Sequence, residues 1–160
     1  MDQEMLEKTG WNVFETVCKT LDERGMKYER DDEKLVDRFG VRGDDFSFDV
    51  IVRVIPGKQV VQMTCPAPYR INEGSRKDAA IAITMINYQL LNGCFDFDMS
   101  DGFLVFRMCQ AYHGSILGTD VFDYMLNALF YTVDEYFDKL FLISKGGMTI
   151  EQLAEKLEED

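Results

Sequence analysis

The order of patterned segments along this chain predicts a small α+β domain. Residues 94–109 read CFDFDMSDGFLVFRMC, two alternating runs around a Ser-Asp-Gly turn, which is typical of a β-hairpin. A segment with helical periodicity lies on each side of it, and a block of strand-like segments lies further upstream. Segregated strands and helices of this kind predict an antiparallel sheet with helices packed on it.

The first helix is expected over residues 13–24. Asn12 can act as its N-cap, with Glu15 three residues later, and Gly25 suits the position after its end. Its apolar residues share one stripe at helical spacing: Val13, Phe14, Val17, Cys18 and Leu21. This stripe is expected to face the core.

Three strands are expected between the first two helices. The weakest signal covers residues 34–41, and the strongest covers residues 46–55, where apolar and polar side chains alternate. A Pro-Gly pair at 56–57 is a turn signal, after which residues 59–65 should return antiparallel.

The second helix, over residues 75–91, carries two apolar stripes. The broader one suits the sheet and consists of Ala79, Ala82, Ile83, Ile86 and Leu90. The narrower one, Ile81, Met85 and Tyr88, needs a second cover. Either the third helix or another subunit can supply it, and Met and Tyr are enriched at subunit interfaces. Ile81, Met85 and Tyr88 are therefore the candidate dimer interface.

The hairpin is expected to turn on a two-residue Asp101-Gly102 loop of type I′. On one face this register gives three apolar pairs: Met99 with Leu104, Phe97 with Phe106, and Phe95 with Met108. On the other face Asp96 is expected opposite Arg107, a favourable cross-strand pair.

The third helix is expected over residues 120–143. Its core face is wide and comprises Phe122, Met125, Leu126, Leu129, Val133, Tyr136, Phe137 and Leu140. Tyr124 and Tyr131 stand at the edge of its polar face. After a Gly-Gly break, Thr149 and Gln152 form a capping box that opens a short last helix.

Composition limits the partners of the chain. One domain over residues 1–160 is the default at this length. Seventeen basic and 29 acidic residues give a net charge of −12, which argues against nucleic acid and membrane surfaces as partners. No apolar run approaches the roughly 18 residues of a membrane span, and the N-terminus lacks a secretory signal, so a cytoplasmic location is expected.

The four cysteines match no zinc pattern and include no CxxC pair. The expected hairpin register sets Cys94 opposite Cys109, with Cα atoms about 5.5 Å apart. Side-chain direction makes this a poor site for a disulfide, so both residues are predicted to be free thiols.

No catalytic constellation is present. His113 is the only histidine, and its place just after a strand favours a turn residue over a catalytic one. The acidic run around the hairpin turn fails the EF-hand pattern, because its sixth and twelfth positions hold Asp101 and Arg107. We therefore predict a protein that is not an enzyme, with no catalytic, cofactor-binding or metal-binding residues and no cofactor.

Several short motifs carry a family resemblance. They are Cys65-Pro66, Met85-Ile86-Asn87, Leu91-Asn92-Gly93 with Phe95, and Asp101-Gly102 before Phe106-Arg107. The stretch that contains them resembles the YbjN family of putative bacterial sensory transduction regulators. The resemblance implies a fold like the type III secretion chaperones, ordered α-β-β-β-α-β-β-α, with residues 146–160 as a short helical extension.

The resemblance also implies a function. Type III secretion chaperones are small, acidic and dimeric, and they bind extended segments of client proteins. We expect a non-enzymatic protein-binding module, chaperone-like or regulatory, that forms a homodimer and binds a protein or peptide client. Tyr124 and Tyr131 are the candidate partner-binding residues. The alternative is a regulatory domain that senses a small ligand in a pocket between sheet and helices.

Overall fold

The computed structural model describes residues 2–113, 115 and 117–159 of the chain. Within them lies one antiparallel sheet of six strands, in the order β1-β2-β3-β4-β6-β5. The strands are β1 (Glu29–Asp31), β2 (Val36–Arg42), β3 (Ser47–Ile55), β4 (Val60–Pro66), β5 (Cys94–Phe97) and β6 (Leu104–Ala111). The helices are α1 (Gln3–Glu23), α2 (Arg76–Gln89), α3 (Thr119–Lys145) and α4 (Ile150–Glu159). This arrangement confirms the predicted α+β class.

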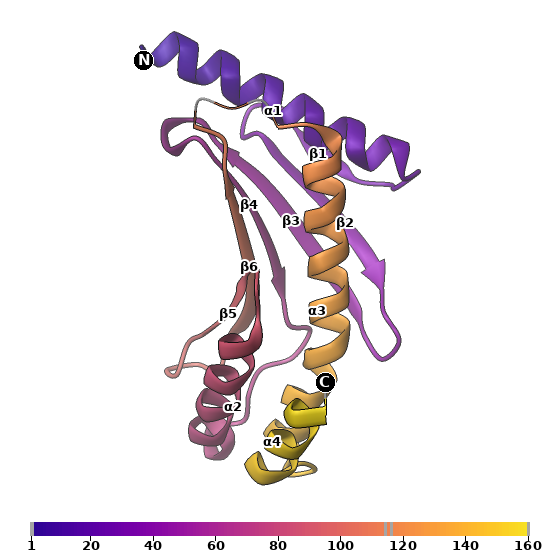
Figure 1. The fold of residues 1–160 in the computed structure, drawn as a ribbon, viewed down its shortest axis with the longest axis vertical. Coiled ribbons are helices and arrows are strands. Elements are labelled where there is room, and N and C mark those ends of the chain that lie inside the picture. Colours follow the sequence, from indigo (N-terminus) through magenta and orange to yellow (C-terminus); the bar gives the residue numbers. More distant parts are fainter. Residues whose placement is uncertain (1, 114, 116, 160) are drawn as a thin grey trace.

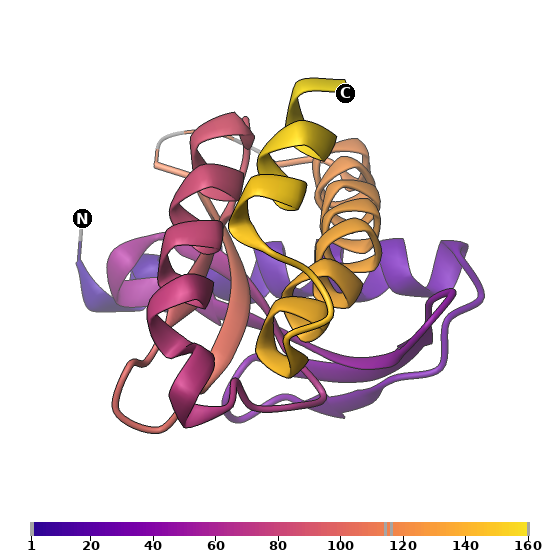
Figure 2. The same cartoon turned by 90° about the horizontal axis from the view of Figure 1, so that it is seen from below.

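The helices cover one face of the sheet, here called the inner face. α3 runs along it, α1 crosses one end, and α4 lies between α2 and α3 (Figures 1 and 2). Because side chains alternate along a strand, β3 buries Phe48, Val50, Val52 and Val54 on the inner face. The opposite, outer face is left largely exposed by the described residues, as the side chains of Asp49 and Arg53 show.

The core lies between the inner face and α3. All eight residues predicted for the core face of this helix are buried. Phe137 is at its centre, with ring centroids 5.6 Å from Phe48, 5.8 Å from Phe95 and 6.3 Å from Tyr69. Aromatic side chains therefore fill the space around Phe137 between α3 and the sheet.

The short last helix is part of the same core. Thr149 N donates to Gln152 Oε1 at 2.9 Å and Gln152 N donates to Thr149 Oγ1 at 3.2 Å, which confirms the predicted capping box. Leu153 and Leu157 are buried with the rest of the core. α4 is thus packed onto the domain.

The first helix begins earlier than predicted. Its N-cap is Asp2, whose Oδ1 accepts a hydrogen bond of 2.8 Å from Met5 N, and Asn12 lies inside the helix. Residues 3–9 are mostly strong helix formers but lack a clear apolar stripe, so periodicity alone missed them. Gly25 does end the helix, with φ +65°.

The strand block holds one more strand than predicted. The three expected strands are β2, β3 and β4, and β1 adds a short edge of three residues paired with β2. The predicted turn at Pro56-Gly57 is a single 3₁₀ turn followed by Gln59 in the left-handed region, with φ +52°.

The predicted hairpin register is wrong by two residues. Phe95 pairs with Phe106 and Phe97 with Leu104, and the loop is closed by Asp98 N donating to Phe103 O at 2.8 Å. A shift of two residues keeps every side chain on its predicted face, so Phe95 and Phe106 are still buried. The loop is longer than two residues, however, and Met99 is exposed within it.

Tertiary contacts explain the observed register. Ile71 N donates to Gly102 O at 2.9 Å, which holds the loop against the segment before α2. Asn87 of α2 fixes the strand itself, since Oδ1 accepts from Phe95 N at 2.8 Å and Nδ2 donates to Phe95 O at 3.0 Å. These bonds outweigh the local preference for a tight Asp-Gly turn.

Candidate interaction surface

The narrower stripe of α2 stays partly uncovered. Ile81 is 50% exposed and Tyr88 is 91% exposed, whereas Met85 is half-buried. A hollow of about 370 Å³ separates α2 from α4, and it is lined by Thr84, Met85, Tyr88, Gln89, Ala154, Leu157 and Glu158. α4 therefore supplies the cover beside Met85, a possibility that the sequence prediction did not consider.

The exposed stripe continues past the end of α2. Leu91 is 97% exposed, and the next residue, Asn92, donates from Nδ2 to Tyr124 Oη at 2.5 Å. This bond joins the end of α2 to the first turns of α3. It brings the candidate dimer interface close to Tyr124, one of the two candidate partner-binding residues.

Tyr131 lies two turns further along α3 and is 72% exposed. No described contact joins Tyr131 to Tyr124 or to the exposed residues of α2. We call Ile81, Met85, Tyr88, Leu91 and Tyr124 the helical patch, with Tyr131 outside it. Helical periodicity does not single out Leu91, because the predicted helix includes both residues 90 and 91 and only Leu90 lies on its core stripe.

The helical patch is suited to binding and not to acid–base chemistry. Its side chains are apolar or aromatic, and the only polar atoms they present are two tyrosine hydroxyls and a thioether sulfur. A contiguous patch of exposed apolar side chains is typical of an interaction surface, because water is released when a partner covers it.

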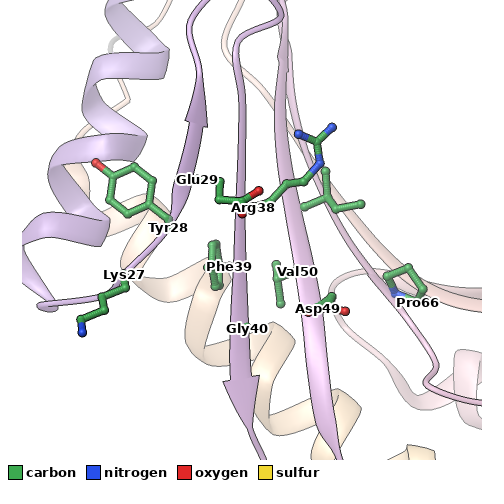
Figure 3. Close-up of a pocket in the computed structure, with 10 residues that line it drawn as sticks. Lys27, Tyr28, Glu29, Arg38, Phe39, Gly40, Asp49, Val50 and Pro66 are labelled. Carbon is green, nitrogen blue, oxygen red and sulfur yellow. The ribbon is translucent and has the colours of Figure 1, made fainter.

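A second hollow lies at the exposed edge of the sheet (Figure 3). Its volume is about 670 Å³, and residues 27–29, 38–40 and 49–51 line it together with Pro66. Its charged side chains are of both signs: Lys27, Glu29, Arg38 and Asp49. This mixture selects no single class of charged ligand.

One buried carboxylate lies between α1 and the sheet. Asp37 of β2 is fully buried; its Oδ2 accepts from Cys18 Sγ at 3.3 Å, and its Oδ1 lacks a hydrogen-bond partner among the described residues. Burial raises the pKa of Asp37 to about 6, against an opposing effect from Arg30. Burial and the neighbouring Asp37 raise the pKa of Cys18 to about 12.

His113 has a structural position at the end of β6. Its ring nitrogens lie 3.3 Å from Gln59 Nε2 and 3.2 Å from Lys58 O, next to the turn that precedes β4. Among the described residues no group of three or more His, Cys, Asp or Glu side chains is placed to hold a metal ion. Nor is any helix in the described part of the chain long and apolar enough to cross a membrane.

Comparison with known proteins places the chain in a family. A family model described as "YbjN: Putative bacterial sensory transduction regulator" matches residues 14–142. The chain belongs to the YbjN family. No curated protein sequence matches it.

The YbjN assignment agrees with the fold. The crystal structure of "YbjN, a putative transcription regulator from E. coli" matches with a TM-score of 0.55 at 13% sequence identity, over 83% of this chain and 91% of that chain. At this identity the likeness shows the fold alone. The YbjN match includes the whole helical patch, whereas α4, which lies beside Met85, is outside it.

Proposed function

We propose that this YbjN-family protein is a non-enzymatic regulator that acts by binding another protein through the helical patch. The observation that carries the proposal is the almost complete exposure of Tyr88 and Leu91, at the end of α2 and shortly before Asn92, which is hydrogen-bonded to Tyr124. Tyrosine is enriched among the few residues that carry most of the free energy of protein association. The family description supports a regulatory role.

The first partner is a second copy of the chain. A twofold axis through the patch would bury the same residues on both subunits, as in most homodimers. The apolar centre would then supply the attraction that a subunit of net charge −12 needs to overcome repulsion from its copy. Because salt screens that repulsion, the dimer should tighten as ionic strength rises.

A client protein is the second partner, in a chaperone-like role. Tyr124 and Tyr131 are the proposed anchors, so a client competes with the second copy for Tyr124, and the acidic surface favours a basic or neutral client. Association with such a client should slow as salt is added, the opposite trend to that of the homodimer. A pull-down that compares wild type with the Tyr124→Ala/Tyr131→Ala variant tests these residues.

The dimer is tested with Tyr88→Glu and Leu91→Glu. Both side chains are exposed in one subunit, so the substitutions should leave the fold intact and convert dimer to monomer. Light scattering reports the mass and circular dichroism reports the fold. Met5→Glu, the same change from an exposed apolar side chain to a carboxylate but on α1, is the matched control and should remain dimeric. A wild type that is monomeric, or glutamate variants that remain dimeric, would contradict the dimer.

A further inference from the structure

Two cysteines face the same arginine on the outer face of the sheet. Arg107 of β6 donates from Nη2 to Cys94 Sγ at 3.6 Å and from Nη1 to Cys109 Sγ at 3.9 Å. The guanidinium is held there by Asp96, whose Oδ2 lies 2.6 Å from Arg107 Nε. One planar group therefore contacts both sulfur atoms, which the alternation of side chains places on the same side of the sheet.

The strand register brings the two cysteines within reach of each other. Cys94 pairs with Arg107, and Cys109 lies two residues further along the same strand, so the cysteines are diagonal neighbours. Diagonal neighbours have Cα atoms about 7–8 Å apart, and a disulfide needs about 4.4–6.8 Å. A movement of about 1–2 Å closes this gap. Cys94 can make it, because it is the first residue of a four-residue edge strand that pairs only with β6, and the hydrogen bonds from Asn87 hold the next residue, Phe95.

The surroundings of the two sulfur atoms differ. Cys109 is exposed, and its sulfur accepts a second contact from Gln62 Nε2 at 3.8 Å. Cys94 is half-buried, and its thiol donates to Asp96 Oδ1 at 3.6 Å. Burial and the neighbouring Asp96 raise the pKa of Cys94, so this residue holds its proton as a thiol. An exposed cysteine can attack an oxidant and become a sulfenic acid. A neighbouring thiol can then react with that sulfenic acid to form a disulfide.

We propose that Cys109 and Cys94 form a redox-active dithiol that reduces a hydroperoxide. The Cys109 thiolate attacks the outer oxygen of the hydroperoxide; the O–O bond breaks, an alcohol or water leaves, and Cys109 becomes a sulfenic acid. The Cys94 sulfur then attacks Cys109; the S–S bond forms, the S–O bond breaks, and the thiol proton leaves with the hydroxide as water. Two thiols and one hydroperoxide thus give one disulfide, one alcohol or water, and one water. This chemistry is independent of whether the helical patch binds a partner.

The remaining cysteines provide an internal control. Cys18 and Cys65 are buried in the core, with exposures of 2% and 0%. Burial raises the pKa of both thiols to about 12, so they should not react on the same timescale.

The test begins with fully reduced protein and one equivalent of hydrogen peroxide. Intact mass should fall by about 2 Da, and peptide mapping should find Cys94 joined to Cys109 with the two core thiols still reduced. Circular dichroism before and after treatment checks that the fold is retained. Absence of oxidation, oxidation of Cys109 beyond sulfenic acid with Cys94 still a thiol, or disulfides between molecules would each overturn the proposal.

Two single variants assign the roles. In Cys94→Ser the sulfenic acid has no resolving thiol and should be trapped on Cys109 by dimedone. In Cys109→Ser the half-buried Cys94 should label at least about tenfold more slowly. Equal labelling of the two variants would overturn the assigned roles. Both substitutions replace a sulfur by an oxygen of similar size, so the variants are expected to fold.

Discussion

Asn92 Nδ2 donates a hydrogen bond of 2.5 Å to Tyr124 Oη. The two residues are far apart in sequence, and their contact joins the end of α2 to the start of α3 at the surface of the protein. Through this bond, the candidate dimer interface on α2 comes to lie close to Tyr124, one of the two candidate partner-binding residues. The helical patch is thus a product of helix packing.

Asn92→Ala should lower the free energy of unfolding by no more than about 1 kcal/mol, because the bond is exposed to water and its net contribution is small. The same change should weaken self-association more than it weakens the fold, since Tyr124 loses its tether. Urea melts and sedimentation measure the two effects. Tyr131→Ala is the control, because Tyr131 lacks a described contact with the patch. A large loss of stability with unchanged association would show that the bond serves the fold.

Asp37 should make the protein less stable as pH rises. The pKa of Asp37 is about 6 in the folded chain and about 3.8 in the unfolded chain, so between these pH values the folded state holds a proton that the unfolded state has released. Stability should therefore fall as pH rises from about 4 to about 6, by on the order of 3 kcal/mol for this group, and level off above pH 7.

The Asp37→Asn variant isolates this effect. Other carboxyls, such as those of Asp96 and Asp123, have pKa values lowered by arginine partners, and they act at lower pH and in the opposite direction. The difference in urea-melt stability between variant and wild type should therefore grow in favour of the variant from pH 4 to pH 7. A constant difference across this range would rule out Asp37 as the source.

Gly102→Ala should strongly destabilise the protein. Gly102 has φ +78°, and a Cβ there would lie 2.3 Å from Ile71 O, where something must shift. Backbone strain alone contributes about 1–3 kcal/mol, so we expect a total loss of at least about 2 kcal/mol in denaturant melts. Gly57→Ala is the matched control, because no atom lies within 4 Å of its Cβ position and its φ is not positive. Equal losses at both sites would contradict the loop contact.

Leu153→Ala should show that α4 belongs to the core. Leu153 is fully buried, and truncation of a buried leucine typically lowers stability by about 2–5 kcal/mol. Glu155→Ala, on the exposed side of the same helix, should change it by less than about 0.5 kcal/mol. A small effect of Leu153→Ala on thermal and denaturant melts would mean that α4 detaches readily in solution.

Local sequence was sufficient where a pattern is long and periodic. The core face of α3, the inner face of β3, the end of α1 at Gly25 and the capping box at Thr149 all follow from spacing and side-chain chemistry. Each of these features depends either on an interaction between residues close in sequence or on the burial of a regular apolar stripe. Such features depend little on what the rest of the chain does.

Tertiary structure decided the features that rest on contacts between distant segments. The hairpin register was set by Ile71 and Asn87, which bind backbone groups of the loop and of β5, and a local turn preference could not anticipate them. The narrower stripe of α2 is covered in part by α4, and its extension to Tyr124 depends on Asn92. Side-chain periodicity determined which residues face the core, because each helix or strand buries the face on which its apolar residues recur, and that recurrence is present in the sequence of the element itself. The surface that the remaining residues form was decided by how those elements pack in three dimensions.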